Sequence, residues 1–462
     1  MNLRTVFRNP MTWAQLIATI LMAGLMTLGY MGAFLSPESH THDAPFLIVN
    51  EDKGVTIDGQ AMNFGTQVLE GITATNPETG DRIAWTVLDS RADAERQLAE
   101  DRAYAAIVIP ETYSQQLASL MQAGSASTPA TTPTPTANAT PATSASTPVA
   151  GTTDATTTST TPAELQPATI DVLLNPAAGA YPTNLAKSVS STAIESVSAQ
   201  VRTQLVQALG GDSAQIPVAF SSVLANPVVA TVIDQQPTGA HTAGGNSPFY
   251  YALLLMLAGF VGMDILYLGL EMIVGRSAVS KIVGMLRGAA VPLSPLQAWG
   301  TRTILSAALA VIGSLVQAWV AVGLLDMAVD RVMPLVVFGM LAIFASAMFT
   351  LLFLTALGTP GLLLAILAQT FVGAPSARGI FPKEMLPEFY QLAGTVLPLR
   401  YITDGVRAIV FYDANGAAGL TRGVIGLAII ATASLILGGA IAWWQNRRAM
   451  AHTEPTPAVT PA

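Results

Sequence analysis

The sequence predicts a polytopic α-helical membrane protein with six transmembrane helices and an extracytoplasmic α/β domain inserted between helices 1 and 2. Two observations lead to this fold class. Only 11% of the 462 residues are charged and 51% are hydrophobic, whereas soluble proteins carry about 25% charged residues. Residues 249–444 also form a nearly continuous apolar block, and about 20 apolar residues are enough for one helix to cross a bilayer.

The first predicted transmembrane helix covers residues 13–35, which contain no charged residue. This stretch is too long for the apolar region of a signal peptide, which has about 7–15 residues. The preceding segment, residues 1–12, carries Arg4 and Arg8. Because basic residues stay on the cytoplasmic side, we expect an uncleaved helix with a cytoplasmic N-terminus.

Residues 36–246 are then extracytoplasmic, and strand-like segments alternate in them with helical ones. This alternation favours an α/β domain with a partly parallel sheet. Ser90 is the expected N-cap of one of the helices. The expected strands are 46–50, 83–88, 104–109, 169–174 and 227–233, and the expected helices are 60–72, 91–102, 111–122 and 181–209.

An insert of different composition divides this domain at residues 123–167. It consists almost wholly of Ala, Thr, Ser, Pro and Gly and contains no aromatic residue. Such a segment cannot bury enough apolar surface to offset the entropy lost on ordering, so we predict that it is disordered. The segments on either side of the insert are expected to form one domain.

Five predicted transmembrane helices follow the extracytoplasmic domain. Residues 362–372 are short for a span, but a sixth helix is required if both termini are cytoplasmic. Arg447 and Arg448 follow the last helix and assign the tail, residues 445–462, to the cytoplasm. The five expected helices are 250–274, 303–325, 332–357, 362–372 and 424–444.

The loop after residue 274 gives the strongest indication of a cytoplasmic segment, because it is basic and contains no acid. Residues 279–287 within it form a candidate amphipathic helix. It would dock in a groove of a cytoplasmic ATPase, or it would contact anionic lipid headgroups. Arg302 is expected to belong to the same loop. The candidate docking residues are Arg276, Lys281, Met285 and Arg287.

Asp264 lies near the middle of the predicted helix 250–274, where a charge costs about 2.5–3.5 kcal/mol. Glu271 follows seven residues later on the same helix face and would pair with Arg276 or Arg302. One interpretation of Asp264 is a substrate or proton site. The favoured one is a polar clamp with Gln317, Gln369 or a backbone group, because no histidine or second acid lies at its depth.

The predicted outer segment, residues 379–413, combines apolar helical faces with isolated charges and is divided by three prolines. Its pieces are too short to span a bilayer, so we expect re-entrant or interfacial helices at the outer leaflet. The candidate site residues here are Phe381, Pro382, Pro387, Pro398, Arg400, Asp404 and Arg407.

Several classes of chemistry are not expected. The chain has no cysteine, and its four histidines form no ligand cluster, so no metal site is predicted. Its Lys187-Ser188 pair follows Ala186 rather than the glycine of a phosphate-binding loop. We therefore predict no catalytic residues, no cofactor, no ATP hydrolysis by this chain and no nucleic-acid partner.

Five sequence segments resemble the ABC-2 type permeases, in particular the Pip/YhgE-like (phage infection protein) group. They are RNP at 8–10, VNEDKG at 49–54, AAIVIPETYSQQLASL at 105–120, SPFYY at 247–251 and FPKEMLPEFY…LPLRYITDGVRAIVFYD at 381–413.

The resemblance implies a permease in a bacterial plasma membrane, forming a homodimer or a heterodimer with a related permease. A separate cytoplasmic ABC ATPase would drive it to export a lipid, peptide or amphiphile. The alternatives are an ATP-independent envelope scaffold, secretion component or phage receptor that uses the outer domain, and a proton-coupled carrier that requires Asp264.

Overall fold

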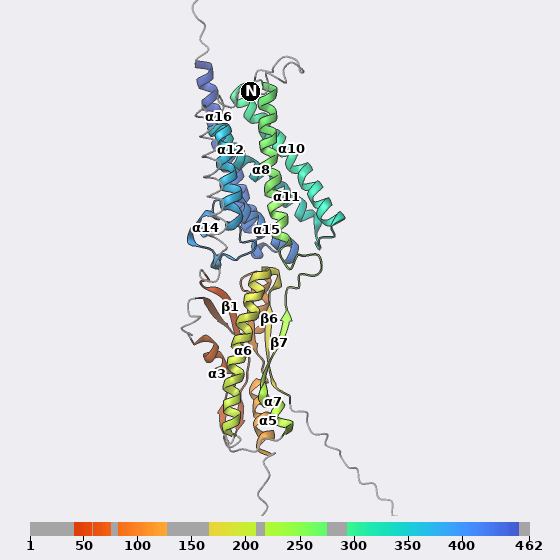
Figure 1. The fold of residues 1–462 in the computed structure, drawn as a ribbon, viewed down its shortest axis with the longest axis vertical. Coiled ribbons are helices and arrows are strands. Elements are labelled where there is room, and N and C mark those ends of the chain that lie inside the picture. Colours follow the sequence, from red (N-terminus) through yellow and green to blue (C-terminus); the bar gives the residue numbers. More distant parts are fainter. Residues whose placement is uncertain are drawn as a thin grey trace, which may run out of the picture.

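The computed structural model describes residues 41–57, 59–74, 82–126, 166–208, 218–274 and 293–451. The predicted helix 13–35, the candidate docking residues after position 274 and most of the predicted insert lie outside these ranges. The described residues form an α/β domain at one end of an elongated molecule and a helical membrane domain at the other (Figure 1).

A five-stranded sheet forms the centre of the α/β domain, in the order β4-β1-β5-β6-β7. β1 pairs in parallel with β4 and β5, whereas β6 pairs antiparallel with β5 and parallel with β7. The sheet is therefore partly parallel, and β6 joins the second half of the domain to the first. The strands are β1 (Ala44–Asn50), β4 (Ile83–Leu88), β5 (Ala105–Ile109), β6 (Ala168–Leu174) and β7 (Val228–Asp234).

The alternation of side chains along β1 divides the domain core into two layers. Phe46 and Ile48 pack with residues of the long helix α6 (Ala180–Ala208). Leu47 and Val49 point to the opposite face and pack with α4 (Arg91–Ala99). Because both faces are covered, the central strands are apolar on both sides, as in other buried parallel sheets.

The expected helix 60–72 is partly wrong. A hairpin of β2 (Val55–Ile57) and β3 (Gln60–Met62) occupies its beginning. Helix α3 (Phe64–Thr73) starts only after Asn63, whose Oδ1 accepts a 2.8 Å hydrogen bond from the backbone N–H of Thr66. This cap satisfies a free N–H group of the first turn and so fixes where the helix begins.

The other predicted elements of this domain are found within a few residues of their expected bounds. Ser90 caps α4, because its Oγ accepts a 3.2 Å hydrogen bond from Asp93 N. Helix α5 (Tyr113–Ala126) continues past position 123, where we placed the start of the insert. The short helix α7 (Val218–Ala225) was not predicted.

Five helical segments of the described residues are long and apolar enough to cross a bilayer, and each overlaps one of the five spans predicted after the outer domain. The sixth span, at 13–35, stays a prediction. The five segments are Ser247–Glu271, Pro295–Leu324, Val332–Leu357, Thr359–Ser376 and Gly416–Met450. In Figure 1 they comprise α8 (Ser247–Val274), α10 (Pro295–Ala318), α11 (Val332–Leu357), α12 (Thr359–Ile366) and α16 (Thr421–Ala451), with the short helices that adjoin them.

Helix α11 is the centre of the membrane domain and packs against α8, α10 and α16. Its contact with α8 is very close at Gly259, where a Cβ atom would lie 2.3 Å from the carbonyl oxygen of Ile343. Small residues allow membrane helices to approach in this way. In contrast, Ile312 of α10 and Ile429 of α16 are each 62% exposed, which suits contact with lipid or with a second copy.

Two predicted boundaries in this domain need correction. Helix α10 begins at Pro295 instead of 303, because Ser294 and Gln297 form a capping box. Arg302 therefore lies inside a helix and not in the loop. The predicted segment 362–372 is part of a longer helical stretch. This stretch consists of α12, a π-helical turn at Leu367–Val372 and α13 (Gly373–Ser376).

The outer segment is divided by its prolines as predicted. Pro382 and Pro387 directly precede η6 (Lys383–Met385) and α14 (Glu388–Ala393), and Pro398 is the first residue of α15 (Pro398–Phe411). For α15 the interfacial alternative is wrong, and the re-entrant alternative stays a prediction. Eleven of its 14 residues are buried, because it packs among α8, α11 and α16 inside the membrane domain.

Candidate functional site

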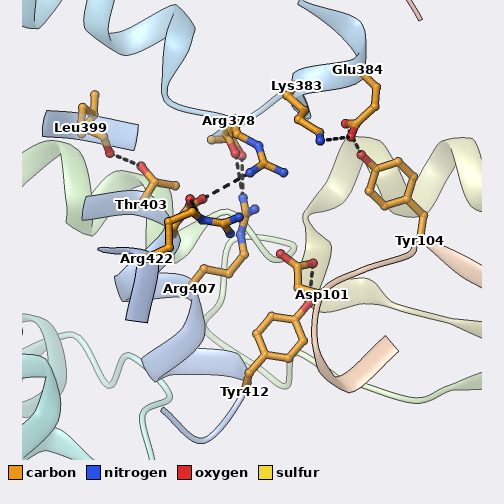
Figure 2. A network of polar contacts seen from close by, with 12 residues as sticks. Asp101, Tyr104, Arg378, Lys383, Glu384, Leu399, Thr403, Arg407, Tyr412 and Arg422 are labelled. Carbon is orange, nitrogen blue, oxygen red and sulfur yellow. Dashed lines mark hydrogen bonds and ion pairs between the residues drawn. The ribbon is translucent and has the colours of Figure 1, made fainter. Parts of the chain in front are cut away.

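The α/β domain and the membrane domain meet in a network of buried polar contacts (Figure 2). Tyr104, directly before β5, donates a 2.7 Å hydrogen bond from Oη to Glu384 Oε2 in η6. The backbone N–H of His42 donates a 2.9 Å bond to the carbonyl oxygen of the same glutamate. Burial raises the pKa of Tyr104 well above its usual range, and the charge of Glu384 adds to the effect, so this phenol remains a donor.

Tyr412 forms the second connection between the domains. Its Oη lies 2.9 Å from Asp101 Oδ1 and 3.0 Å from Asn175 Oδ1, so one hydroxyl proton is shared by two acceptors. Asn175 Nδ2 donates to the carbonyl oxygen of Ala103 at 3.1 Å, which orients the amide. The structure thus fixes the end of α15 against loops of the outer domain.

A charged cluster lies on the membrane-domain side of this junction. Asp404 is 4% exposed, its Oδ2 lies 2.9 Å from Arg422 Nε and its Oδ1 lies 3.9 Å from Arg378 Nη1. Arg407 donates from Nη2 to the carbonyl oxygens of Arg378 and Gly379, at 3.1 and 3.2 Å. One carboxylate therefore neutralises only part of the positive charge that surrounds it.

A cavity of about 300 Å³ opens between the two domains at this cluster. Six basic and three acidic side chains line it. Burial also raises the pKa of the Asp101 carboxyl, although Arg407 and Arg378 oppose the effect. The wall of the cavity is therefore an environment that attracts anions. The basic residues are Arg102, Arg378, Lys383, Arg400, Arg407 and Arg422, and the acidic ones are Asp43, Asp101 and Glu384.

The outer segment supplies several of these groups, and the structure brings its predicted site residues together. Pro382, Arg400 and Arg407 line the cavity, and Asp404 pairs with its cations. Phe381 packs its ring against Tyr181 of α6, with centroids 4.8 Å apart. Pro387 and Pro398 have a different role and begin α14 and α15.

Six residues of the junction were not predicted as site residues. Four of them contact distant parts of the chain, since Tyr412 bonds to Asp101 across 311 positions and Tyr104 bonds to Glu384 across 280. No local pattern marks such a pair. The sequence contains one local signal, Tyr412 directly before Asp413 in the VFYD motif, and this motif is part of the family resemblance. The six residues are Asp101, Tyr104, Asn175, Arg378, Tyr412 and Arg422.

The predicted intramembrane polar site is not assembled. Gln317 Nε2 donates to the carbonyl oxygen of Leu254 at 3.1 Å, and Gln369 Nε2 donates to Thr350 Oγ1 at 2.7 Å. Neither glutamine contacts Asp264, whose buried Oδ1 has no hydrogen-bond partner among the described residues. The favoured clamp between Asp264 and these glutamines is therefore wrong.

Glu271 belongs to a separate contact at the far end of α8. Its Oε1 lies 2.6 Å from Arg302 Nη2 of α10, so one of the two predicted partners is confirmed. The guanidinium carbon of Arg302 also lies 3.9 Å from the ring centre of Tyr267. This ion pair joins the ends of the two helices between which the predicted docking loop runs.

The VNEDKG segment has a structural role in the α/β domain. Asp52 accepts hydrogen bonds from Ser114 N at 2.9 Å and from Gly65 N at 3.1 Å. Its carboxylate thus lies at the N-termini of both α3 and α5, where a negative charge is favourable. Ser114 comes from the AAIVIPETYSQQLASL segment, so two of the family segments meet here. Among the described residues, no group of three or more His, Asp or Glu side chains is placed to hold a metal ion.

One of the comparisons with known proteins covers most of the chain. A family model described as "Protein of unknown function (DUF3533)" matches residues 15–432. The chain belongs to this family. The family match includes the outer domain, the junction and most of the membrane domain. It therefore extends over every residue of the cationic cavity.

One curated relative of this DUF3533 protein is the "Uncharacterized protein YhgE" of Bacillus subtilis (strain 168). It is 24% identical over 124 residues, which is 26% of this chain and 15% of the relative. The match thus spans about 15% of the length of that relative. No solved structure matches. These findings and the five apolar helices show a membrane protein of the DUF3533 family that is similar to YhgE over a short part of its length. The assignment to the Pip/YhgE-like group and to ABC-2 permeases stays a prediction.

Proposed function

We propose that this DUF3533 protein is the membrane-spanning permease subunit of an ABC-type exporter. It works as a homodimer or as a heterodimer with a related permease, and a separate cytoplasmic ATPase drives it. Its cargo is a lipid, a peptide or another amphiphile that moves outward. The observation that carries this proposal is the cationic cavity between the membrane domain and the outer domain.

The position of the cavity fits an exit site. One wall belongs to α15 and the segment before it, which pack inside the membrane domain, and the other belongs to loops of the outer domain. An amphiphile that leaves the bilayer must transfer a polar head and an apolar body together. A site with excess positive charge at this boundary stabilises an anionic head as it leaves the membrane.

The opposite end of the membrane domain supports the same proposal. Arg447 and Arg448 lie near the far end of α16, away from the junction (Figure 1). The Glu271–Arg302 pair, with N and O 2.6 Å apart, holds α8 to α10 on either side of the loop 275–292. A force applied to that loop would reach both helices, and through α8 it would reach α11 and α15.

Affinity purification of the full-length protein from its native membrane tests the partner. An ABC ATPase should co-purify with the wild-type protein and be lost from the Lys281→Glu/Arg287→Glu variant. A matched variant, Arg447→Glu/Arg448→Glu, reverses two other cytoplasmic charges and should keep the ATPase. Absence of an ATPase from the wild-type complex would contradict the proposal, and so would unchanged binding by the loop variant.

One observation favours the alternative, an ATP-independent scaffold, secretion component or receptor. β7 is an edge strand of the sheet, and its Val229 and Val232 are 40% and 57% exposed. Exposed edge strands accept a further strand from a partner protein. In that case, function would survive reversal of Lys281 and Arg287 and would be lost when a proline in β7 prevents strand pairing.

A further inference from the structure

A second cavity, of about 530 Å³, lies along α6 in the outer domain. We call it the α6 groove. It extends over α6 from Tyr181 to Gln200, which at 1.5 Å per residue corresponds to about 28 Å of helix. The opposite walls are formed by α3, with Ile72, and by β4, with Ile83 and Trp85. Its volume lies in the range of about 300–1,000 Å³ that is usual for ligand sites.

The wall of the α6 groove is more apolar than the types of its lining residues suggest. Leu185, Val189 and Val197 provide aliphatic side chains. The hydroxyl of Thr192 donates at 3.0 Å to the carbonyl oxygen of Ser188, one helical turn earlier. Ser196 donates in the same way to Thr192 O at 2.9 Å. Because these hydroxyl protons are used within the helix, Thr192 and Ser196 add to the aliphatic part of the wall. Arg82, Asn184 and Gln200 are its larger polar residues.

One end of the groove lies next to the cationic cavity. Thr41, Tyr181 and Met385 line the groove, whereas Asp43, Ala178 and Glu384 line the cavity. Three separate segments of the chain therefore contribute to both spaces. On each of them, a residue that lines the groove lies one to three positions from a residue that lines the cavity. The wall between them includes the 2.9 Å hydrogen bond from His42 N to Glu384 O. From this wall α6 runs away from the membrane domain (Figure 1).

We propose that the α6 groove binds the hydrocarbon chain of an anionic membrane lipid whose head occupies the cationic cavity. This inference rests on the proposed export function and names its substrate class. Three observations select this occupant: the excess of basic side chains in the cavity, the apolar wall of the adjoining groove and the junction with the membrane domain. Residues 75–81, which connect Ala74 to Arg82 at the rim, read TNPETGD and supply no long apolar side chain.

Photo-crosslinking on the full-length protein in lipid nanodiscs tests the site. The probe is phosphatidylglycerol with a diazirine in its acyl chain, and the labelled peptides are mapped by mass spectrometry. We expect labelling of α6 peptides between residues 184 and 200, about tenfold above that by phosphatidylcholine with the same chain. Labelling confined to α10 and α16 would overturn the inference. Equal labelling by the two lipids would overturn it as well, because the head would then not be selected by charge.

Two pairs of variants define the two parts of the site. Thr192→Trp fills the groove, whereas Ser191→Trp places the same ring on the adjacent exposed position, which does not line it. Lys383→Glu reverses a charge in the cavity, and Lys187→Glu is its control on α6. We expect Thr192→Trp and Lys383→Glu to reduce labelling of α6 about tenfold and the two controls to keep it. Unchanged labelling in Thr192→Trp would contradict the inference.

The outcomes separate this inference from the proposed function. If α6 is labelled but no ATPase co-purifies, the lipid site stands and the exporter function fails. If an ATPase co-purifies and α6 is not labelled, the exporter function stands and the groove has a different occupant, such as a segment of the chain itself.

Discussion

Tyr104 Oη donates a 2.7 Å hydrogen bond to Glu384 Oε2, although the two residues are 280 positions apart in the chain. The bond joins the residue directly before β5 to the short helix η6. Together with the contact of Tyr412 to Asp101, it fixes how the outer domain meets the membrane domain. Residues of both domains line the cationic cavity, so its shape depends on how the domains meet.

We predict that Tyr104→Phe and Tyr412→Phe each lower the free energy of unfolding by about 1–3 kcal/mol, because each leaves a buried acceptor without its donor. Tyr113→Phe is the control, since Tyr113 Oη is buried and has no hydrogen-bond partner among the described residues. Thermal unfolding in detergent gives the comparison. Equal losses of unfolding free energy in all three variants would mean that the two junction hydrogen bonds do not stabilise the fold.

Asp101 gives the junction a dependence on pH. Burial raises its pKa above the ordinary value of 3.8, against the opposing charges of Arg407 and Arg378. Between the unfolded and the folded pKa, the folded state binds more protons than the unfolded state, so stability falls as pH rises through this window. Asp101→Asn should therefore remove part of this fall and stabilise the protein at neutral pH. Melting temperatures measured from pH 4 to 8 test this, and a variant that is less stable than wild type at pH 7 would contradict it.

Much of the fold could be predicted from local patterns. The continuous apolar run of β1 and the long uncharged stretches identify a buried strand and the spans, because burial of both strand faces or of a whole helix excludes polar residues over a typical length. The beginnings of helices were less predictable. Asn63 and Ser294 set the starts of α3 and α10 through capping hydrogen bonds, whose effect outweighs the apolar period of the residues around them.

The candidate site was predictable only in part. The outer segment supplies Arg400, Asp404 and Arg407, and their isolated charges in an apolar stretch marked them as site residues. Asp101 and Tyr104 lie in an ordinary soluble-looking domain, so nothing local distinguishes them. Their role depends on which surface of the outer domain meets the membrane domain, and a single sequence contains no direct record of that contact.

The Glu271–Arg302 pair should behave as a buried ion pair. Glu271→Gln and Arg302→Met each leave one charge unpaired, and we predict a loss of about 3–5 kcal/mol for either. The double variant Glu271→Gln/Arg302→Met should recover most of this loss, because it removes both desolvated charges. A double-mutant cycle in detergent measures the coupling. Additive losses would show that the 2.6 Å contact contributes little.

Asp264 lies seven residues before Glu271 on the same helix, yet it should respond to substitution with the opposite sign. Its buried Oδ1 has no hydrogen-bond partner among the described residues, and a charge at this depth costs up to about 2.5–3.5 kcal/mol. Asp264→Asn removes the charge and keeps the shape, so we predict a higher melting temperature, whereas Glu271→Gln lowers it.

Export by the same two variants separates the remaining interpretations of Asp264. A proton-coupled carrier that depends on this acid would lose transport in Asp264→Asn while the fold becomes more stable. The permease proposed here would retain transport, because its energy enters through the loop 275–292. A drop in melting temperature of Asp264→Asn as large as that of Glu271→Gln would show that the carboxylate has a stabilising partner, such as the same helix of a second copy.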